Sequence, residues 1–488
     1  MYKYAKTTVL FSLLLALIFS SAVSIKAQVP FLKAGAAMVD ITPPVNPVYP
    51  PSGRYDHEKL FIRAVVLDNG MTRATLIGAD INNIYEDSYV IAAPVIASEL
   101  NCPIENILMS PTHTHSGRTA GPPPEGGRLH DTKLVAEAII QAVREAKSRL
   151  QPARIGFGTG AAYLNVNRDV ISKDTRLWTQ AANSDGPSDK TLAVILITDL
   201  NGSPLAGYMN YPMHPVNGYL SGITSADFPG AACRYIEKAF GDDMVMIYSQ
   251  GASGDQNPVW LRPGTNALAS KSGLEITGYE LVRETVEAPL REGRVPHGKL
   301  DPEVADNLER WMDALGVILG EETIRVMTSI NTMQDNVTIW GKQEILTLPG
   351  RKRTNTGREG SPGTYEDGPN VELRIGLLGI GDIALTSVNA EVYNIIARKL
   401  KTLSPMSNTI MVSIANGKAE SGYIIDDASY GRNTFQVLGN RVRPGYAEQG
   451  IVNSLAGLIR EYDSKKTPAK DAGVKTDISE NKKTKTRK

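Results

Sequence analysis

Two histidines separated by a single residue are the positions whose types and spacing point most clearly to chemistry. His113 and His115 follow the largely apolar segment Asn106–Met109, and the chain has only six histidines in 488 residues. Such a segment is typical of a buried strand, which directs residues i and i+2 to one face. Imidazole is a common zinc ligand and titrates near neutral pH, so the pair predicts chemistry at a strand's C-terminal end. The alternative is a pair of polar side chains on a solvated turn.

Three further apolar segments end in polar loops that are rich in glycine or proline. His214 follows one of them, residues 249–258 form the second loop, and Glu391 follows Thr386–Val388. Two imidazoles and a carboxylate that converge would suit Zn²⁺, with one position left for water. Two alternatives stay open: Glu391 as a carboxylate favoured by a helix N-terminus, and His214 as a core histidine.

The elements that must position these residues alternate irregularly. Residues 60–67 and 74–78 flank Asp68-Asn69-Gly70 and predict a hairpin, as do 192–200 and 205–211. Apolar periodicity predicts helices over 132–150, capped by Asp131, over 228–240, over 391–403, and two between 273 and 320. Further strands are predicted over 244–248, 371–378, 383–388 and 409–414, and a long mobile loop or lid over 350–369. The predicted class is α/β (mixed α+β): a mixed sheet with hairpins, covered by helices, with the zinc site at the strand C-terminal ends.

The ends of the chain differ in composition from the rest. Residues 1–27 have the charged, apolar and small-residue order of a secretory signal, with an uncleaved anchor as the alternative. Residues 464–488 are Lys-rich and predict a disordered tail, or an electrostatic anchor to anionic cell-surface material. Between them, 28–463 is expected to form one catalytic domain, exported to the periplasm or secreted, with no later membrane span. The chain has 52 Lys and Arg residues and 52 Asp and Glu residues, so its net charge excludes a strong positive field that would attract nucleic acid. Spacing does not show whether Cys102 and Cys233 meet, and the oligomeric state is unknown.

The chain resembles the catalytic domain of the neutral (non-lysosomal) ceramidase family, as a divergent member. The most specific match is Thr112–Gly117, Thr-His-Thr-His-Ser-Gly. The other matching segments fall in the family's order, from about residue 34 to 437. They are Ala34–Pro44, Asn167-Arg168, Tyr211–His214, Asn389–Glu391, Ala415–Gly417 and Gly422–Ile424.

The resemblance implies a Zn²⁺ ion bound by four side chains. Carried over by position, the ligands are His113, His214, Glu391 and Tyr423. A phenol is an unusual zinc ligand, and Tyr430 is a nearby alternative. The resemblance also implies that His115 stands beside the metal and faces the reacting carbonyl, and that Arg168 is an oxyanion or substrate donor.

One segment departs from the family pattern. The family carries a serine, often assigned as the nucleophile, where this chain has Asn257 within Gly254-Asp255-Gln256-Asn257-Pro258. An amide cannot form an acyl-enzyme, but it can donate hydrogen bonds to an oxyanion. Ser253 is a poor geometric substitute, and Asp255 or His115 would shuttle the proton to the leaving group. The residues after Gln436 are also too few for the family's C-terminal immunoglobulin-like domain.

Together these features predict an exported, zinc-dependent hydrolase that cleaves an amide or ester by metal-activated water. Its substrate would be a small molecule, a lipid such as an N-acyl sphingosine in sphingolipid metabolism, or a glycoconjugate. The first alternative is a hydrolase of the same fold that acts on a glycan or glycoconjugate. The second is a catalytically inactive, metal-bound binding protein.

Overall fold

The computed structural model describes residues 32–45, 58–117, 130–218, 224–259, 302–357 and 359–466. The predicted signal segment, one of the two helices predicted between 273 and 320, and most of the predicted tail lie outside these ranges. No helix within them is long and apolar enough to span a membrane. Cys102 and Cys233 are both free thiols, so no disulfide joins them.

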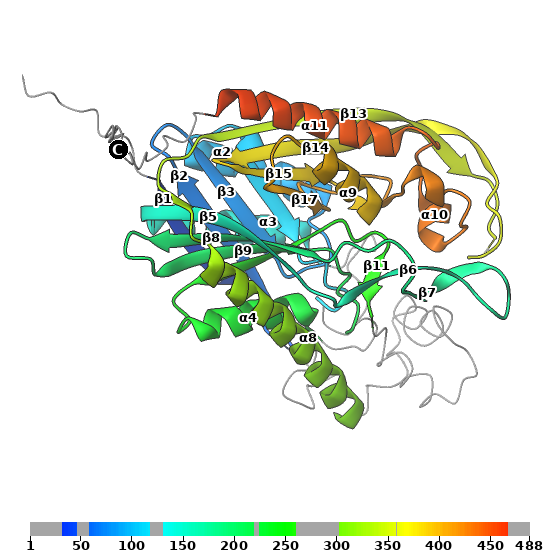
Figure 1. The fold of residues 1–488 in the computed structure, drawn as a ribbon, viewed down its shortest axis with the longest axis horizontal. Helices are drawn as coiled ribbons and strands as arrows, with labels where there is room; N and C mark the ends of the chain where they lie inside the picture. Colours follow the sequence, from blue (N-terminus) through cyan, green and yellow to red (C-terminus); the bar gives the residue numbers. More distant parts are fainter. Residues whose placement is uncertain are drawn as a thin grey trace, which may run out of the picture.

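A nine-stranded mixed sheet forms the largest element of the fold (Figure 1). Its order is β10-β9-β8-β5-β1-β2-β3-β4, with β12 paired to β5. The pairs β3–β4 and β9–β10 are parallel, and the other pairs are antiparallel. The strands are β1 (Lys33–Asp40), β2 (Phe61–Asp68), β3 (Arg73–Ala79), β4 (Ile107–Pro111), β5 (Gln151–Ala161), β8 (Thr191–Asp199), β9 (Pro204–Tyr211), β10 (Val245–Gln250) and β12 (Met333–Gln334). Both predicted hairpins, β2–β3 and β8–β9, are confirmed.

A second, four-stranded sheet packs face to face on the first. Its order is β13 (Ile339–Arg353), β14 (Tyr365–Ile380), β15 (Ile383–Val388) and β17 (Thr409–Ser413). Alternate residues of both sheets, such as Leu76 and Tyr208 from one and Leu385 and Ile410 from the other, share one apolar core. The predicted class, a mixed α/β fold with helix-covered sheet, is confirmed, and the second sheet is an addition to it.

Helices cover the outer face of each sheet, which gives four layers, helix, sheet, sheet and helix. Helices α2 (Glu86–Leu100), α3 (Thr132–Ser148), α4 (Asp227–Ala239) and α8 (Pro302–Ser329) bury the outer side of the large sheet. Helices α9 (Asn394–Leu403) and α11 (Ala447–Lys465) cover the small sheet, with α11 along the top of Figure 1. As predicted, Asp131 caps α3, since its carboxylate accepts from the backbone N–H groups of Lys133 and Leu134.

Two sequence predictions about the second sheet are wrong. Residues 350–369 are not a long loop, because β13 and β14 pair as far as Arg353 and Tyr365. The glycines serve this pairing: a Cβ on Gly350 would lie 1.7 Å from the carbonyl oxygen of Pro369. In addition, α9 begins at Asn394 and not at Glu391, because Glu391 belongs to a short strand.

Small elements surround the C-terminal ends of the main strands. A three-stranded sheet has the order β11 (Gln256–Pro258), β6 (Asn165–Ile171) and β7 (Trp178–Asn183). A two-stranded parallel ladder joins β16 (Glu391–Val392) to β18 (Tyr423–Ile424). The remaining elements are η1 (Ile104–Asn106), η4 (Asp427–Ser429) and α10 (Phe435–Gly439).

Candidate metal centre

A left-handed turn at the end of β4 orients the first two histidines. β4 ends at Pro111, and His113 has a φ of 67°, so strand alternation does not explain why the two imidazoles share a face. The backbone N–H of His113 donates to Ile81 O at 3.1 Å, and that of His115 donates to Pro215 O at 3.1 Å. The predicted convergence of the two side chains is present, but the turn and these backbone bonds produce it.

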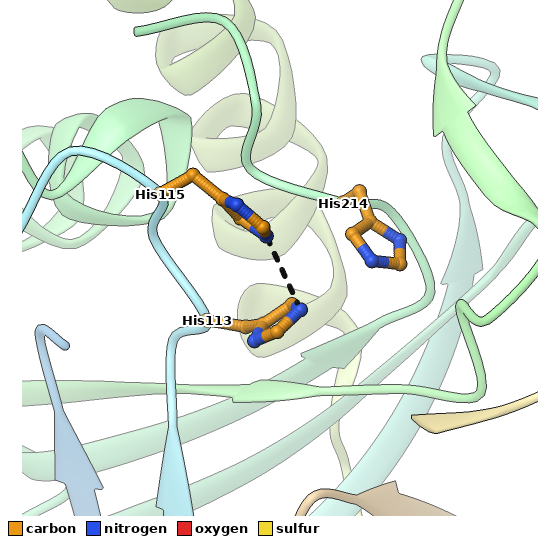
Figure 2. Close-up of side chains that lie close together, drawn as sticks. All are labelled: His113, His115 and His214. Atoms are coloured by element: carbon orange, nitrogen blue, oxygen red, sulfur yellow. Dashed lines mark hydrogen bonds between the residues drawn. The ribbon is translucent and has the colours of Figure 1, made fainter. Parts of the chain in front are cut away.

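His113 and His214 are fixed in one tautomer. The Nδ1 of His113 lies 2.7 Å from Asn82 O, and the Nδ1 of His214 lies 2.8 Å from Ser253 O. A carbonyl oxygen only accepts, so each Nδ1 carries the proton and each Nε2 keeps its lone pair. Figure 2 shows His113 and His214 directed toward one another, with His115 beside them. An Nδ1 proton donated to a carbonyl oxygen and a free lone pair on Nε2 are usual for metal-binding imidazoles.

The Nε2 atoms and the carboxylate of Glu391 meet at one point. Glu391 Oε2 lies 3.0 Å from His214 Nε2 and 3.4 Å from His113 Nε2. His115 Nε2 lies 3.4 Å from His113 Nε2, and the ligand atoms of the three histidines are within 4.8 Å of one another. Two ligands on a tetrahedral zinc with bonds of 2.0–2.1 Å are about 3.4 Å apart. The types of these donors suit Zn²⁺, and the separations between Glu391 and His113 and between His113 and His115 match this spacing.

A two-residue ladder brings a phenol to the same point. Glu391 and Tyr423 are register partners in the β16–β18 pair, so their side chains lie next to each other. Burial and the charge of Glu391 raise the pKa of the Tyr423 hydroxyl, and the charge of Arg168 opposes this, so the phenol lies near both groups. Tyr430, the alternative phenol, donates instead to Val442 O at 3.0 Å and packs beside the Arg351 guanidinium. His115 Nε2 lies at ligand spacing from His113 Nε2, so His115 is a second candidate for the fourth position beside Tyr423.

Burial and mutual contact shift the pKa values of these groups. Burial lowers the pKa of His214 to about 4, with the Arg168 charge acting in the same direction. Burial also lowers the pKa of His115 well below its usual range, and His113 and His214 add to this. Burial alone would raise the pKa of Glu391, but the interactions with His113 and His214 hold it well below its usual range. Neutral imidazoles and an ionised carboxylate are the forms that bind a cation.

Arg168 lies next to this cluster on β6 and is held in one orientation. Its Nη1 donates to Asn257 Oδ1 at 3.3 Å, and its Nη2 donates to Gly254 O. The guanidinium carbon lies 5.5 Å from the Tyr423 ring centre and 5.3 Å from that of Phe435. Asn257 thus orients Arg168 through its amide oxygen.

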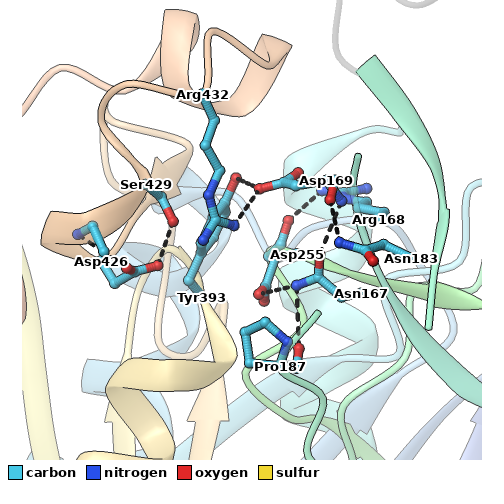
Figure 3. A network of polar contacts seen from close by, with 12 residues as sticks. Asn167, Arg168, Asp169, Asn183, Pro187, Asp255, Tyr393, Asp426, Ser429 and Arg432 are labelled. Carbon is cyan, nitrogen blue, oxygen red and sulfur yellow. Dashed lines mark hydrogen bonds and ion pairs between the residues drawn. The ribbon is translucent and has the colours of Figure 1, made fainter. Parts of the chain in front are cut away.

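Asp255 belongs to the network of polar contacts that also includes Asn167 and Arg168 (Figure 3). Its carboxylate accepts from Asn167 Nδ2 at 2.9 Å, from Asn394 N at 2.9 Å and from Asn394 Nδ2 at 2.5 Å. Burial, aided by the nearby charge of Asp169, raises the pKa of Asp255 to about 7. These contacts brace the loop that holds Asn257 and do not direct the carboxylate at the histidines.

Sequence reasoning missed Asp169 in this region. The buried Asp169 Oδ2 accepts from Tyr393 Oη and Arg432 Nη1, each at 3.2 Å, and so links β6 to the segments after β16 and β18. The run Asn167-Arg168-Asp169, three polar residues in succession within a strand, was the available signal. Ser253 is buried, and its Oγ accepts from Gln250 Nε2 at 2.5 Å.

No family model matches the chain, but the curated proteins include clear relatives. It is 25% identical over 262 residues to neutral ceramidase B of Dictyostelium discoideum, covering 49% of this chain and 36% of that one. Neutral ceramidase A of the same organism is 28% identical over 171 residues, 32% of this chain and 24% of that one. The neutral ceramidase of Pseudomonas aeruginosa is 25% identical over 235 residues, 43% of this chain and 33% of that one.

The fold agrees with these matches. The crystal structure of the Pseudomonas aeruginosa neutral ceramidase superposes with a TM-score of 0.62 at 15% identity, over 89% of this chain and 75% of that one. The chain is similar to the neutral ceramidases in sequence over part of its length and in fold. A second solved structure, described as ceramidase complexed with C2, has the same TM-score and identity, and the match covers 76% of that chain. The aligned region spans about a third or less of the curated neutral ceramidases, from 24 to 36% of their length.

Proposed function

We propose that this chain is a zinc-dependent hydrolase of the neutral ceramidase type that cleaves the N-acyl bond of a sphingosine-like lipid. The observation that carries the proposal is the convergence of Glu391 Oε2 with the Nε2 atoms of His113 and His214, at 3.4 and 3.0 Å, next to Tyr423. The ligands would be His113, His214 and Glu391, with Tyr423 or His115 in the fourth position. The similarity in sequence and fold to neutral ceramidases supports the amide as the bond that is cleaved.

Each polar side chain near the centre then has a chemical task. Bound Zn²⁺ would supply Lewis-acid polarisation of a carbonyl and activation of water. The Arg168 guanidinium, fixed by Asn257 and Gly254, presents a positive charge to the oxyanion that develops on the substrate. The Nε2 of His115, within reach of the centre, would carry a proton to the leaving nitrogen when it is not a ligand.

No side-chain hydroxyl is required for this reaction. Asn257 cannot act as a nucleophile, and the buried Ser253 hydroxyl is bonded to Gln250. In this proposal the attacking group is water, and Asn257 contributes by orienting Arg168. The segment of residues 1–27, charged and then apolar, supports export of this hydrolase to the periplasm or the medium.

The test is an assay of the purified full chain on an N-acyl sphingosine, a simple ester and a panel of glycans. Each substrate is tested with and without a chelator, and Zn²⁺ is then restored. We expect amide hydrolysis that the chelator abolishes and Zn²⁺ recovers. Cleavage of a glycan alone would favour the glycan hydrolase, and metal binding without turnover would favour a binding protein. Asn257→Ser, which restores the family residue, should keep the metal, and ceramidase activity gained only in this variant would indicate a diverged substrate.

A further inference from the structure

The segment Ile414–Asn416, which follows β17, bonds both to β4, which precedes His113, and to the turn that precedes Glu391. The Asn416 backbone N–H donates to Met109 O at 2.9 Å, and its Oδ1 accepts from Met109 N at 2.8 Å. Its Nδ2 donates to Ile107 O at 3.0 Å. The side chain thus imitates a peptide group and pairs with the outer edge of β4, the strand that leads to His113. Asn416 itself is 2% exposed.

The same segment also holds the turn that carries Glu391. Ile414 N donates to Ala390 O at 3.1 Å, and Ala415 N donates to Val388 O at 3.0 Å. Ala390 directly precedes Glu391. One short segment is therefore bonded on one side to the strand of His113 and on the other side to the turn of Glu391.

The backbone of this segment adopts an unusual conformation. Ile414 and Asn416 both have a φ of 57°, and a positive φ is rare for a β-branched residue such as isoleucine. Arg374 holds the segment in place, because its Nη1 donates to Asn416 O at 2.6 Å. The Arg374 guanidinium is in turn paired with Glu86 at 2.6 and 3.0 Å. Strained backbone that is held by surrounding contacts is most often found at functional sites.

We propose that Asn416 is a positioning residue that sets the spacing between His113 and Glu391 and thereby the metal affinity of the centre. This inference rests on the proposed function. His113 follows β4 of the large sheet, and Glu391 follows β15 of the small sheet. Asn416 bonds to β4 and lies in the segment that also holds the turn before Glu391. A packed apolar core keeps two sheets together, but directional hydrogen bonds are needed to fix their register at the site.

The test compares two asparagine-to-glycine substitutions. Asn416→Gly removes both side-chain bonds to β4, yet glycine accepts a φ of 57° without strain and keeps the backbone bond to Met109. The control is Asn101→Gly, at an exposed position with a φ of 49° at the end of α2. Zn²⁺ affinity is measured by chelator competition, and the visible spectrum of the Co²⁺-loaded protein reports ligand geometry.

We expect Asn416→Gly to bind Zn²⁺ about 10–100-fold more weakly, as is usual for partners that orient metal ligands, with an altered Co²⁺ spectrum. Asn101→Gly should match the wild type in both. Unchanged affinity and spectrum in folded Asn416→Gly would overturn the inference. If Asn416→Gly does not fold, Zn²⁺ affinity and the Co²⁺ spectrum are measured on Asn416→Asp instead. This variant keeps the acceptor for Met109 N but loses the donor to Ile107 O. A wild-type chain that binds no metal would overturn the proposed function, and this inference with it.

Discussion

The imidazole half and the carboxylate half of the candidate metal centre come from different sheets and are held in different ways. The imidazoles follow β4 and β9 of the large sheet, and backbone carbonyls fix the Nδ1 atoms of His113 and His214. Glu391 and Tyr423 belong to the two-residue β16–β18 ladder beside the small sheet. The Glu391 side chain contacts His113 and His214, and it lies next to its register partner Tyr423.

This difference indicates which half the metal must organise. The imidazoles are oriented before any ion arrives, since their backbone partners do not depend on it. The carboxylate and the phenol take their orientation from each other and from the imidazoles. A cation at the centre would therefore replace the contacts that Glu391 makes with His113 and His214. Substitutions in the carboxylate half should therefore change metal binding with little effect on the fold.

The largest effect is expected for Glu391→Gln, which keeps the shape of the side chain and removes its charge. We expect at least a hundredfold loss of Zn²⁺ affinity, or about 2.7 kcal/mol, and a comparable or larger loss of activity. Glu420→Gln is the matched control, because Glu420 is exposed and pairs only with Arg441 among the described residues. Chelator competition measures the affinity. Wild-type metal affinity in Glu391→Gln would mean that the carboxylate is not a ligand.

An effect of similar size, but confined to the rate, is expected for Arg168→Lys. Lysine keeps the positive charge but cannot form the guanidinium's bonds to Asn257 Oδ1 and Gly254 O together. Loss of an oxyanion donor costs about 2.7–4 kcal/mol, or roughly 10²–10³ in rate. Steady-state kinetics and metal analysis on the same sample check this. Loss of zinc in parallel with activity would show that Arg168 supports the ligands instead.

The fourth ligand position is tested by comparing Tyr423→Phe with His115→Ala. If Tyr423 is the ligand, Tyr423→Phe should weaken Zn²⁺ binding and shift the Co²⁺ spectrum, while His115→Ala should lower the rate with zinc retained. The reverse pattern would assign the position to His115, whose Nε2 lies 3.4 Å from that of His113. Both variants are measured by chelator competition at one pH.

The smallest effect is expected for Ser253→Ala. The Ser253 hydroxyl accepts from Gln250 Nε2, which also donates to Met213 O at 2.9 Å and so keeps a partner in the variant. We expect most of the activity to remain, with a loss of stability of about 1 kcal/mol at most, measured by thermal unfolding. Complete inactivity with zinc still bound, or a trapped acyl-enzyme on Ser253, would contradict attack by water.

Much of the fold could be predicted from the sequence because local patterns determine it. The β2–β3 and β8–β9 hairpins follow from turn residues between apolar runs, and the start of α3 follows from Asp131. The second sheet could not be predicted as a separate layer, because apolar alternation does not show which surface a strand will face. The long β13–β14 ribbon was missed since its outer part is rich in glycine, proline and charge, which in isolation is typical of a loop.

In the candidate site too, the sequence predicted the residues but not the geometry of the first pair. His113, His115, His214 and Glu391 were singled out by their place after apolar strands, and the structure brings them together. The reason given for the first pair, strand alternation, was wrong, because the φ of 67° at His113 is set by contacts with Ile81 and Asn82.

Metal analysis of the full chain, purified without chelator, tests the central claim most directly. We expect close to one zinc per chain in the wild type and in His130→Ala, a histidine outside the cluster. His113→Ala and His214→Ala should each contain almost none, since each removes an imidazole that is oriented toward the centre by a backbone carbonyl. Stoichiometric zinc in His113→Ala would contradict the account.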